Sequence, residues 1–247
     1  MIHNEKYIEG YTIHATDDEL GKVDAFLFDD ENWAIRYLVA DTRKWLPGRK
    51  VLLSPISIQN INHQADHISF SLTKEQVKNS PDIDADQPVS RAQEVRMNQY
   101  FGWGNYWGAP GVWGPGFYPY ELAQQEFNEM TEEEAEVSQV RKTSEVIGYR
   151  VFTYNGEAGE IDSFLIDDKT WKIRYVVIRS KIEGEEKFLL VSTDWITDVR
   201  WADESLHISV EKESLVKAPA YHPDLTIDRD YEESVFKAFN KPPYWME

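Results

Sequence analysis

A constant offset of 138 residues relates the first hundred residues of this chain to the last hundred. The match is densest between residues 10–39 and 148–177, where 14 of 30 positions are identical. The offset also carries Tyr106-Trp107 onto Tyr244-Trp245, and it never changes, so no insertion or deletion separates the two copies. We therefore expect three parts: a first repeat with its C-terminal helix over residues 1–100, a connecting segment over 101–147, and a second repeat with its helix over 148–247.

Each repeat is patterned as a series of short β-strands. Apolar and polar residues alternate, as in strands that bury one face, in six segments of the first copy: 8–15, 21–28, 33–40, 50–54, 56–62 and 67–72. Six short strands with small loops favour an antiparallel barrel or a strongly curled sheet. The predicted fold class is mainly β: two small six-stranded antiparallel barrels in tandem, each followed by short helices. Ser90 with Gln93 has the spacing of a capping box for the first of the longer helices.

An acidic loop joins the second and third strands in both copies, Asp29–Asn32 and Asp167–Thr170. Short polar side chains of this kind satisfy the backbone of a hairpin turn. The alternative is a paired-carboxylate metal site or an acid–base dyad. Adjacent carboxylates on an extended turn diverge, and neither copy supplies a histidine at ligand spacing, so the turn is the favoured interpretation.

A hairpin centred in the middle of this loop predicts two buried polar pairs. Asp24 then faces Tyr37, and Asp162 faces Tyr175, on the strand face that also carries Phe26. A carboxylate on an apolar face needs a hydrogen bond, which each tyrosine hydroxyl would donate. The pairs are expected to lock the strand register, and the alternative is a buried acid that takes part in proton transfer.

Arg36 and Arg174 fall on the opposite strand face. A planar, permanent cation at this position either bridges acidic neighbours within the chain or meets a carboxylate of a partner. We expect the intramolecular salt bridge.

The connecting segment begins with a run of Gly, Pro and aromatic residues over 101–120, which we call the strap. Gly and Pro prevent a regular helix or strand here, whereas the acidic stretch Glu121–Glu136 is predicted to be helical. Large aromatic side chains dominate protein-binding surfaces. Two roles stay open for these aromatics, sealing the barrel ends and binding a partner. The candidate partner-binding residues are Trp103, Tyr106, Trp107, Trp113, Phe117, Tyr118, Tyr244 and Trp245.

Composition excludes several classes of function. The net charge of −18 disfavours nucleic acid and anionic membrane surfaces as partners, and cysteine is absent, so thiolate chemistry and disulfides are impossible. No nucleophile motif, phosphate-binding loop or dinucleotide fingerprint occurs. His63 and His67 are four residues apart, but the residues between them are patterned as a turn between strands and no third ligand is nearby in sequence, so a zinc site is not expected. We therefore expect no catalytic residue, no cofactor and no metal. No apolar run is long enough to span a membrane, which makes the cytoplasm the expected location.

Two sequence elements, each present in both copies, resemble the PRC-barrel family. They are Gly21-Lys22-Val23-Asp24 with Gly159-Glu160-Ile161-Asp162, and Trp33-Ala34-Ile35-Arg36-Tyr37 with Trp171-Lys172-Ile173-Arg174-Tyr175. The resemblance implies a small six-stranded barrel that serves as an adaptor without catalysis of its own. That domain occurs in the photosynthetic reaction centre H subunit, in a ribosome maturation factor and in free-standing proteins. This chain lacks the membrane helix of the first and the preceding domain of the second, so it is most similar to the free-standing tandem form.

Three functional hypotheses follow. The leading one is a scaffold or adaptor that binds a protein partner, with its two halves packed as an internal pseudo-dimer and the whole chain a monomer or homodimer. The first alternative is a peripheral component of a membrane electron-transfer complex, like the H subunit. The second alternative is a small-molecule binder that uses a cleft between the barrels.

Overall fold

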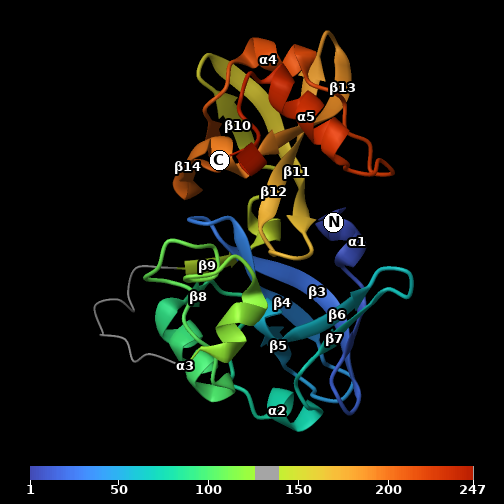
Figure 1. Ribbon diagram of the computed structural model, residues 1–247, viewed down its shortest axis with the longest axis vertical. Helices are drawn as coiled ribbons and strands as arrows, with labels where there is room; N and C mark the ends of the chain where they lie inside the picture. The colour runs from blue at the N-terminus through green and yellow to red at the C-terminus, as the bar shows by residue number, and fades with distance from the viewer. Residues whose placement is uncertain (126–138, 247) are drawn as a thin grey trace. The chain divides into compact units, whose positions relative to one another are not determined.

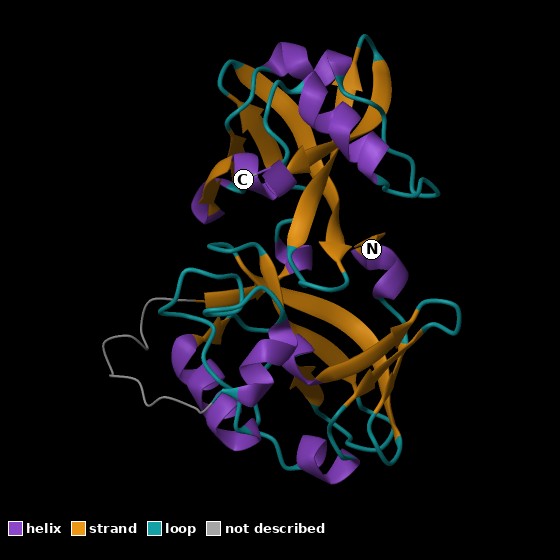
Figure 2. Cartoon of the chain, in the orientation of Figure 1, coloured by secondary structure: helices purple, strands orange, loops and turns teal. Residues whose placement is uncertain are grey.

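The computed structural model describes residues 1–125 and 139–246. Contacts among them divide the chain into two compact units. The N-terminal unit comprises Lys6–Glu145 with Lys169–Lys172, and the C-terminal unit comprises Met1–Glu5, Val146–Asp168 and Ile173–Glu247. Both units are mainly β, with a few short helices beside the strands (Figure 2).

The six strands expected in each repeat are present. In the N-terminal unit they are β2 (Thr12–His14), β3 (Glu19–Asp29), β4 (Ala34–Asp41), β5 (Lys50–Leu53), β6 (Ile58–Asn62) and β7 (His67–Phe70). In the C-terminal unit they are β10 (Arg150–Thr153), β11 (Gly156–Asp167), β12 (Ile173–Ile182), β13 (Glu185–Ser192), β14 (Ile196–Arg200) and β15 (Ser205–Ile208). The strand order is β5-β4-β3-β2-β7-β6 in one sheet and β13-β12-β11-β10-β15-β14 in the other, which is the same order at the same offset. Figure 1 labels most of these strands.

The expected closed antiparallel barrel is wrong on two counts. Neither sheet closes within the described residues, because β5 and β6 end one strand path and β13 and β14 end the other. Both sheets are also mixed, since β2 pairs with β7 in parallel and β10 pairs with β15 in parallel. The reason lies in one 3-10 turn in each sheet, η1 (Pro55–Ser57) between β5 and β6 and η5 (Thr193–Trp195) between β13 and β14. The strand pairings make β5 and β6 run in the same direction, so η1 does not reverse the chain as a hairpin would.

Each sheet gains one short strand from outside its own sequence repeat. Strand β1 (Ile2–Asn4) pairs with the end of β11. Strand β9 (Gln139–Lys142) pairs with the end of β3 and also with β8 (Val89–Ser90). Asn4 lies opposite Leu165 and Lys142 lies opposite Leu27, which are equivalent pairs at the offset of 138. Each compact unit therefore draws residues from both sequence repeats.

Short helices follow the strands as the sequence predicts. They are α2 (Lys74–Lys78) and α3 (Arg91–Phe101) after the first set, and α4 (Lys212–Lys217) and α5 (Arg229–Ala238) after the second. The predicted capping box is confirmed, because the Ser90 side chain accepts from the Gln93 amide while the Gln93 side chain accepts from the Ser90 amide. Of the acidic stretch Glu121–Glu136 expected to be helical, only its first four residues fall in a helix, the 3-10 helix η2 (Pro119–Gln124), and residues 126–138 lie outside the described residues.

A hydrophobic cluster joins the sheet of the N-terminal unit to α3 and β9. Its buried members are Leu27, Tyr37, Val39, Leu52, Ile83, Ala85, Val89, Met97 and Val140. The core thus includes residues from the strands of the sheet, from the segment before α3 and from β9. This packing places α3 directly against the strand that carries Tyr37.

Candidate functional site

The strap closes over the sheet of the N-terminal unit. Trp103, Tyr106 and Trp113 are 4%, 5% and 0% exposed. The Trp113 indole donates a 2.6 Å hydrogen bond to the Thr170 carbonyl, and two short-range backbone bonds, Gly111 to Gly114 and Trp113 to Gly116, hold the irregular chain in place. These three aromatic side chains therefore pack inside the molecule.

Arg36 lies beneath the strap with its side chain 1% exposed. Its Nε donates to Asp29 Oδ2 at 2.5 Å, and its Nη1 donates to the Val112 carbonyl at 2.7 Å. The guanidinium stacks 3.5 Å from the ring centre of Tyr106 and 4.6 Å from that of Trp113. A planar cation suits this position because it forms hydrogen bonds at its edge and stacks on aromatic rings with its faces.

A fully buried carboxyl, Glu94 on α3, lies next to this stack. It accepts hydrogen bonds from Tyr106 Oη at 2.8 Å, from Tyr37 Oη at 3.3 Å and from Arg91 Nη1 at 2.8 Å. Burial raises the pKa of Glu94 to about 7, and the Arg91 cation and the Tyr106 hydrogen bond offset only part of that shift. Burial also raises the pKa of Tyr37 and of Tyr106. Both phenols therefore stay protonated and act as donors.

The C-terminal unit repeats this cluster at the offset of 138. Glu232 accepts from Tyr175 Oη at 2.8 Å and from Tyr244 Oη at 3.0 Å, and Arg229 Nη1 lies 3.3 Å from it. Arg174 stacks 4.2 Å from the ring centre of Tyr244. Its charge partner, Asp167, lies 3.6 Å away. Both copies thus enclose a glutamate between two phenols and an arginine.

The tryptophan that follows the tyrosine packs against the same arginine in both units. Arg91 lies 4.1 Å from the ring centre of Trp107, and Arg229 lies 3.8 Å from that of Trp245. Trp107, Tyr244 and Trp245 are all half-buried. These three candidate residues therefore belong to the edge of the two clusters.

The clusters favour a structural role over chemistry at the glutamate. Arg91 donates to Glu94 and the Arg36 cation acts on the same carboxyl, and two cations this near disfavour a metal cation there. A neutral carboxyl can hold a proton here, but the described contacts enclose it on all sides. The cluster connects the sheet, α3 and the strap through hydrogen bonds to one carboxyl.

The expected Asp24–Tyr37 pair does not form. Leu27, not Asp24, lies opposite Tyr37, and Asp24 instead pairs with Lys50 Nζ at 2.8 Å. The reason is that Trp33 adopts a left-handed φ of 52° and the hairpin closes one residue later than its midpoint predicts. Moving the centre by one residue changes each strand partner by two residues, and a bulge at Leu27/Phe28 adds a third, so Leu27 takes the place expected for Asp24.

The equivalent pair in the second copy is corrected in the same way. Leu165, not Asp162, lies opposite Tyr175, again beside a bulge and a tryptophan at positive φ, Trp171. The Tyr175 hydroxyl reaches Glu232 instead. In both copies the tyrosine thus binds a helical glutamate rather than the strand aspartate.

Sequence reasoning missed Glu94 and Glu232, although a signal was present. Both follow an arginine by three residues, Arg91 and Arg229, and the offset of 138 relates all four. A charged pair retained in both copies at the start of a helix indicates a shared contact. The helix pattern alone did not show which face of α3 would be buried.

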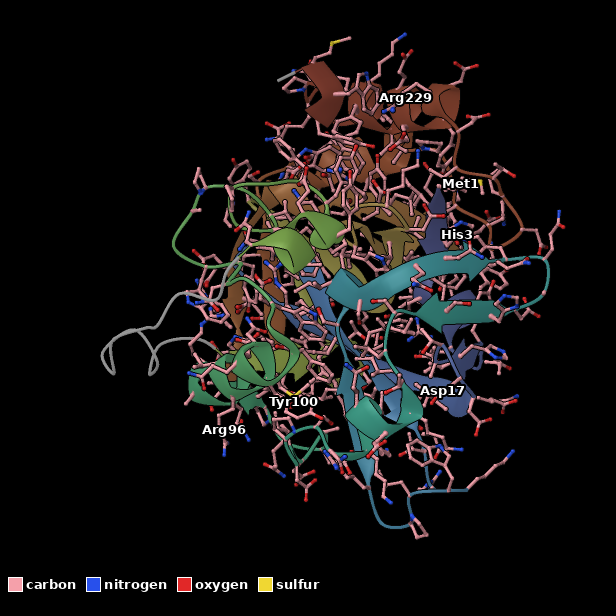
Figure 3. The ribbon with its side chains drawn as sticks, turned by 60° about the horizontal axis from the view of Figure 1, so that its bottom comes forward. Met1, His3, Asp17, Arg96, Tyr100 and Arg229 are labelled. Atoms are coloured by element: carbon pink, nitrogen blue, oxygen red, sulfur yellow. The ribbon has the colours of Figure 1, made fainter. Side chains whose placement is uncertain are left out.

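A short turn of the strap keeps its aromatic side chains exposed. Phe117, Tyr118 and Tyr120 are 68%, 38% and 54% exposed. The rings of Tyr118 and Tyr120 stack with centres 5.6 Å apart, and the Glu121 carboxylate accepts from the amides of Phe117 and Tyr118. We call residues 117–120 the aromatic turn. Figure 3 labels two further exposed residues, Arg96 and Tyr100, on α3 of the same unit.

Comparison with known proteins gives one family match. Residues 139–214 match the family model of the PRC-barrel domain. The match begins at β9 and extends through β15 into α4, so it covers the strands of the second repeat. No curated protein matches the chain. No helix among the described residues is long and apolar enough to cross a membrane.

Proposed function

We propose that this chain is a non-catalytic scaffold of two PRC-barrel repeats that binds a protein partner in the cytoplasm. The family match supports the assignment for residues 139–214, and the identical strand order supports extending it to the first repeat. The buried glutamate clusters support a structural purpose for the polar residues that the two repeats share.

The observation that carries the proposal is the aromatic turn. Phe117, Tyr118 and Tyr120 are exposed on a segment that buried anchors hold in place. A held aromatic surface loses little entropy on binding, and aromatic residues are common at the centres of protein interfaces. The turn therefore has the properties of a binding surface and not of a flexible linker.

Capture of a partner from a lysate of the source cells tests this proposal. The triple variant Phe117→Ala/Tyr118→Ala/Tyr120→Ala should recover at least about tenfold less of the partner than wild type does, because hot-spot residues carry most of the binding energy. Tyr154→Ala is the matched control, since Tyr154 is 72% exposed in the C-terminal unit. Equal recovery with all three proteins, at unchanged circular dichroism, would contradict binding through the turn.

A further inference from the structure

The C-terminal unit carries an open groove of about 930 Å³ between its long strands and α4. Ala158, Ile182 and Leu215 provide buried apolar walls. Val216, which is 55% exposed, and Lys212 stand at its margin on α4. No residue of the glutamate clusters or of the aromatic turn lines this groove.

The equivalent place in the N-terminal unit is filled by a tryptophan of the chain itself. The Trp45 indole Nε1 donates a 2.6 Å hydrogen bond to the carbonyl of Leu20. Lys74 Nζ lies 4.8 Å from the centre of the Trp45 ring, a cation–π contact. The offset of 138 carries Leu20 to Ala158 and Lys74 to Lys212, and both counterparts line the open groove.

The two copies differ in the connection that supplies this tryptophan. In the N-terminal unit β4 ends at Asp41 and β5 begins at Lys50, so the intervening loop, residues 42–49, folds Trp45 back onto the sheet. In the C-terminal unit β12 and β13 continue to a tight turn at Glu183-Gly184, which leaves no loop to fold back. Alanine at 158 in place of leucine also removes side-chain volume from the groove.

We infer that this groove docks a tryptophan side chain that a basic segment of a partner polypeptide presents. The filling loop of the N-terminal unit shows the chemistry that fits: residues 42–49 include Arg43, Lys44 and Arg49 and no acidic residue. The lining of the open groove has one more acid than base: Glu157, Glu160, Glu183 and Glu186 against Arg179, Lys181 and Lys212, with Glu160 and Arg179 paired at 2.8 Å. That balance favours a basic segment over an acidic one.

This inference goes beyond the proposed function, because it concerns a different surface and a stated class of ligand. The two are separable by experiment. The triple variant of the aromatic turn leaves the groove intact, and the variants below leave the turn intact. Loss of one binding activity therefore does not imply loss of the other.

Fluorescence anisotropy with a labelled peptide of residues 42–49 tests the inference on the full-length protein. We expect a dissociation constant of about 10–100 μM, as for a short peptide with one aromatic anchor. Ala158→Leu restores the leucine that stands beside the indole in the filled copy and should tighten binding about two- to fivefold through added apolar contact. Lys212→Ala should weaken it about two- to fivefold by removing the cation–π contact.

Matched controls distinguish the groove from nonspecific charge attraction. Lys217→Ala removes the same charge from the same helix, α4, outside the groove, and should leave affinity unchanged. The peptide carrying Trp45→Ala should lose binding. Fold is checked by circular dichroism, and Lys212→Ala keeps the test valid if Ala158→Leu does not fold.

Three outcomes would overturn the inference. The first is no binding at about 1 mM peptide, where any specific contact of this size is detectable. The second is equal affinity for wild type, Ala158→Leu and Lys212→Ala. The third is binding of N-acetyltryptophanamide as tight as that of the peptide, since this would identify a small-molecule site and not a polypeptide docking groove.

Discussion

The Glu94 carboxyl is fully buried, and its removal from water carries a large desolvation free energy. Removing an ionised carboxylate from water without compensation is strongly unfavourable, so the group is either paired or neutral. Here Tyr37, Tyr106 and Arg91 all donate to it. The three donors come from a strand, the strap and α3, and their convergence on one acceptor joins these three elements.

The raised pKa of Glu94 makes the stability of the N-terminal unit dependent on pH. The pKa rises from 4.5 to about 7 on folding, so the folded state holds this proton more tightly than the unfolded state. The stabilisation is complete below pH 4.5 and is lost as the pH rises through 7. The full loss is on the order of 3 kcal/mol.

Glu94→Gln should abolish this dependence. Urea unfolding measured from pH 4.5 to 8 should give a wild-type free energy of unfolding that falls, relative to the variant, by about 3 kcal/mol across that range. Glu75→Gln, which removes an exposed carboxyl on α2, is the control, and its free energy of unfolding should change with pH as that of wild type does. Parallel curves for Glu94→Gln and wild type would show that Glu94 stays ionised.

The long bulged strands β3 and β11 depend on one glycine each. Gly21 has a φ of +134°, and a Cβ placed on it would lie 2.0 Å from the carbonyl oxygen of Asp41. Gly159 has a φ of +145°, and a Cβ placed on it would lie 2.2 Å from the carbonyl oxygen of Arg179. The offset of 138 relates both pairs, so the two copies share the close approach of these strands to their neighbours. No other residue type fits a backbone contact this short.

Gly21→Ala should therefore destabilise the N-terminal unit by more than about 2 kcal/mol, through steric conflict added to backbone strain. Gly48→Ala is the matched control, because Gly48 has a φ of +81° with no atom within 4 Å of the added Cβ. It should cost about 1 kcal/mol. Thermal or urea unfolding measures the stability of both variants. Equal losses of unfolding free energy would mean that β3 and β4 move apart to accommodate the added Cβ at little cost.

At the scale of the whole molecule, the net charge of −18 opposes compaction. Salt screens this repulsion, since the Debye length falls from about 30 Å at 0.01 M to about 3 Å at 1 M. The surface ion pairs are weakened by the same screening, but exposed pairs contribute little each. The repulsion between like charges should therefore dominate the response to salt.

We expect the melting temperature to rise by several degrees between about 0.01 M and about 0.5 M NaCl. Differential scanning calorimetry measures the shift. KCl should produce the same rise, because screening depends on ionic strength and not on the cation. A fall in melting temperature would show instead that attractive ion pairs outweigh the net repulsion.

Local patterns were sufficient to predict the elements and their order. Period-two alternation predicted the strands, and Ser90 with Gln93 predicted the start of α3. The same patterns could not predict strand register, because bulges and the positive φ of Trp33 depend on contacts made after folding. The Asp24–Tyr37 pair was wrong for this reason.

The sequence by itself determined that one β-rich unit occurs twice, because an unbroken offset of 138 is a property of residue order alone. Only the tertiary structure decided how strands pair, which side chains surround Glu94, and which strap aromatics are buried. It also decided that β1 joins the sheet of the second repeat, that β9 joins the sheet of the first, and that one groove is filled by Trp45 while its counterpart is open. These features join residues far apart in the chain, and their energies arise from contacts and desolvation that no local pattern records.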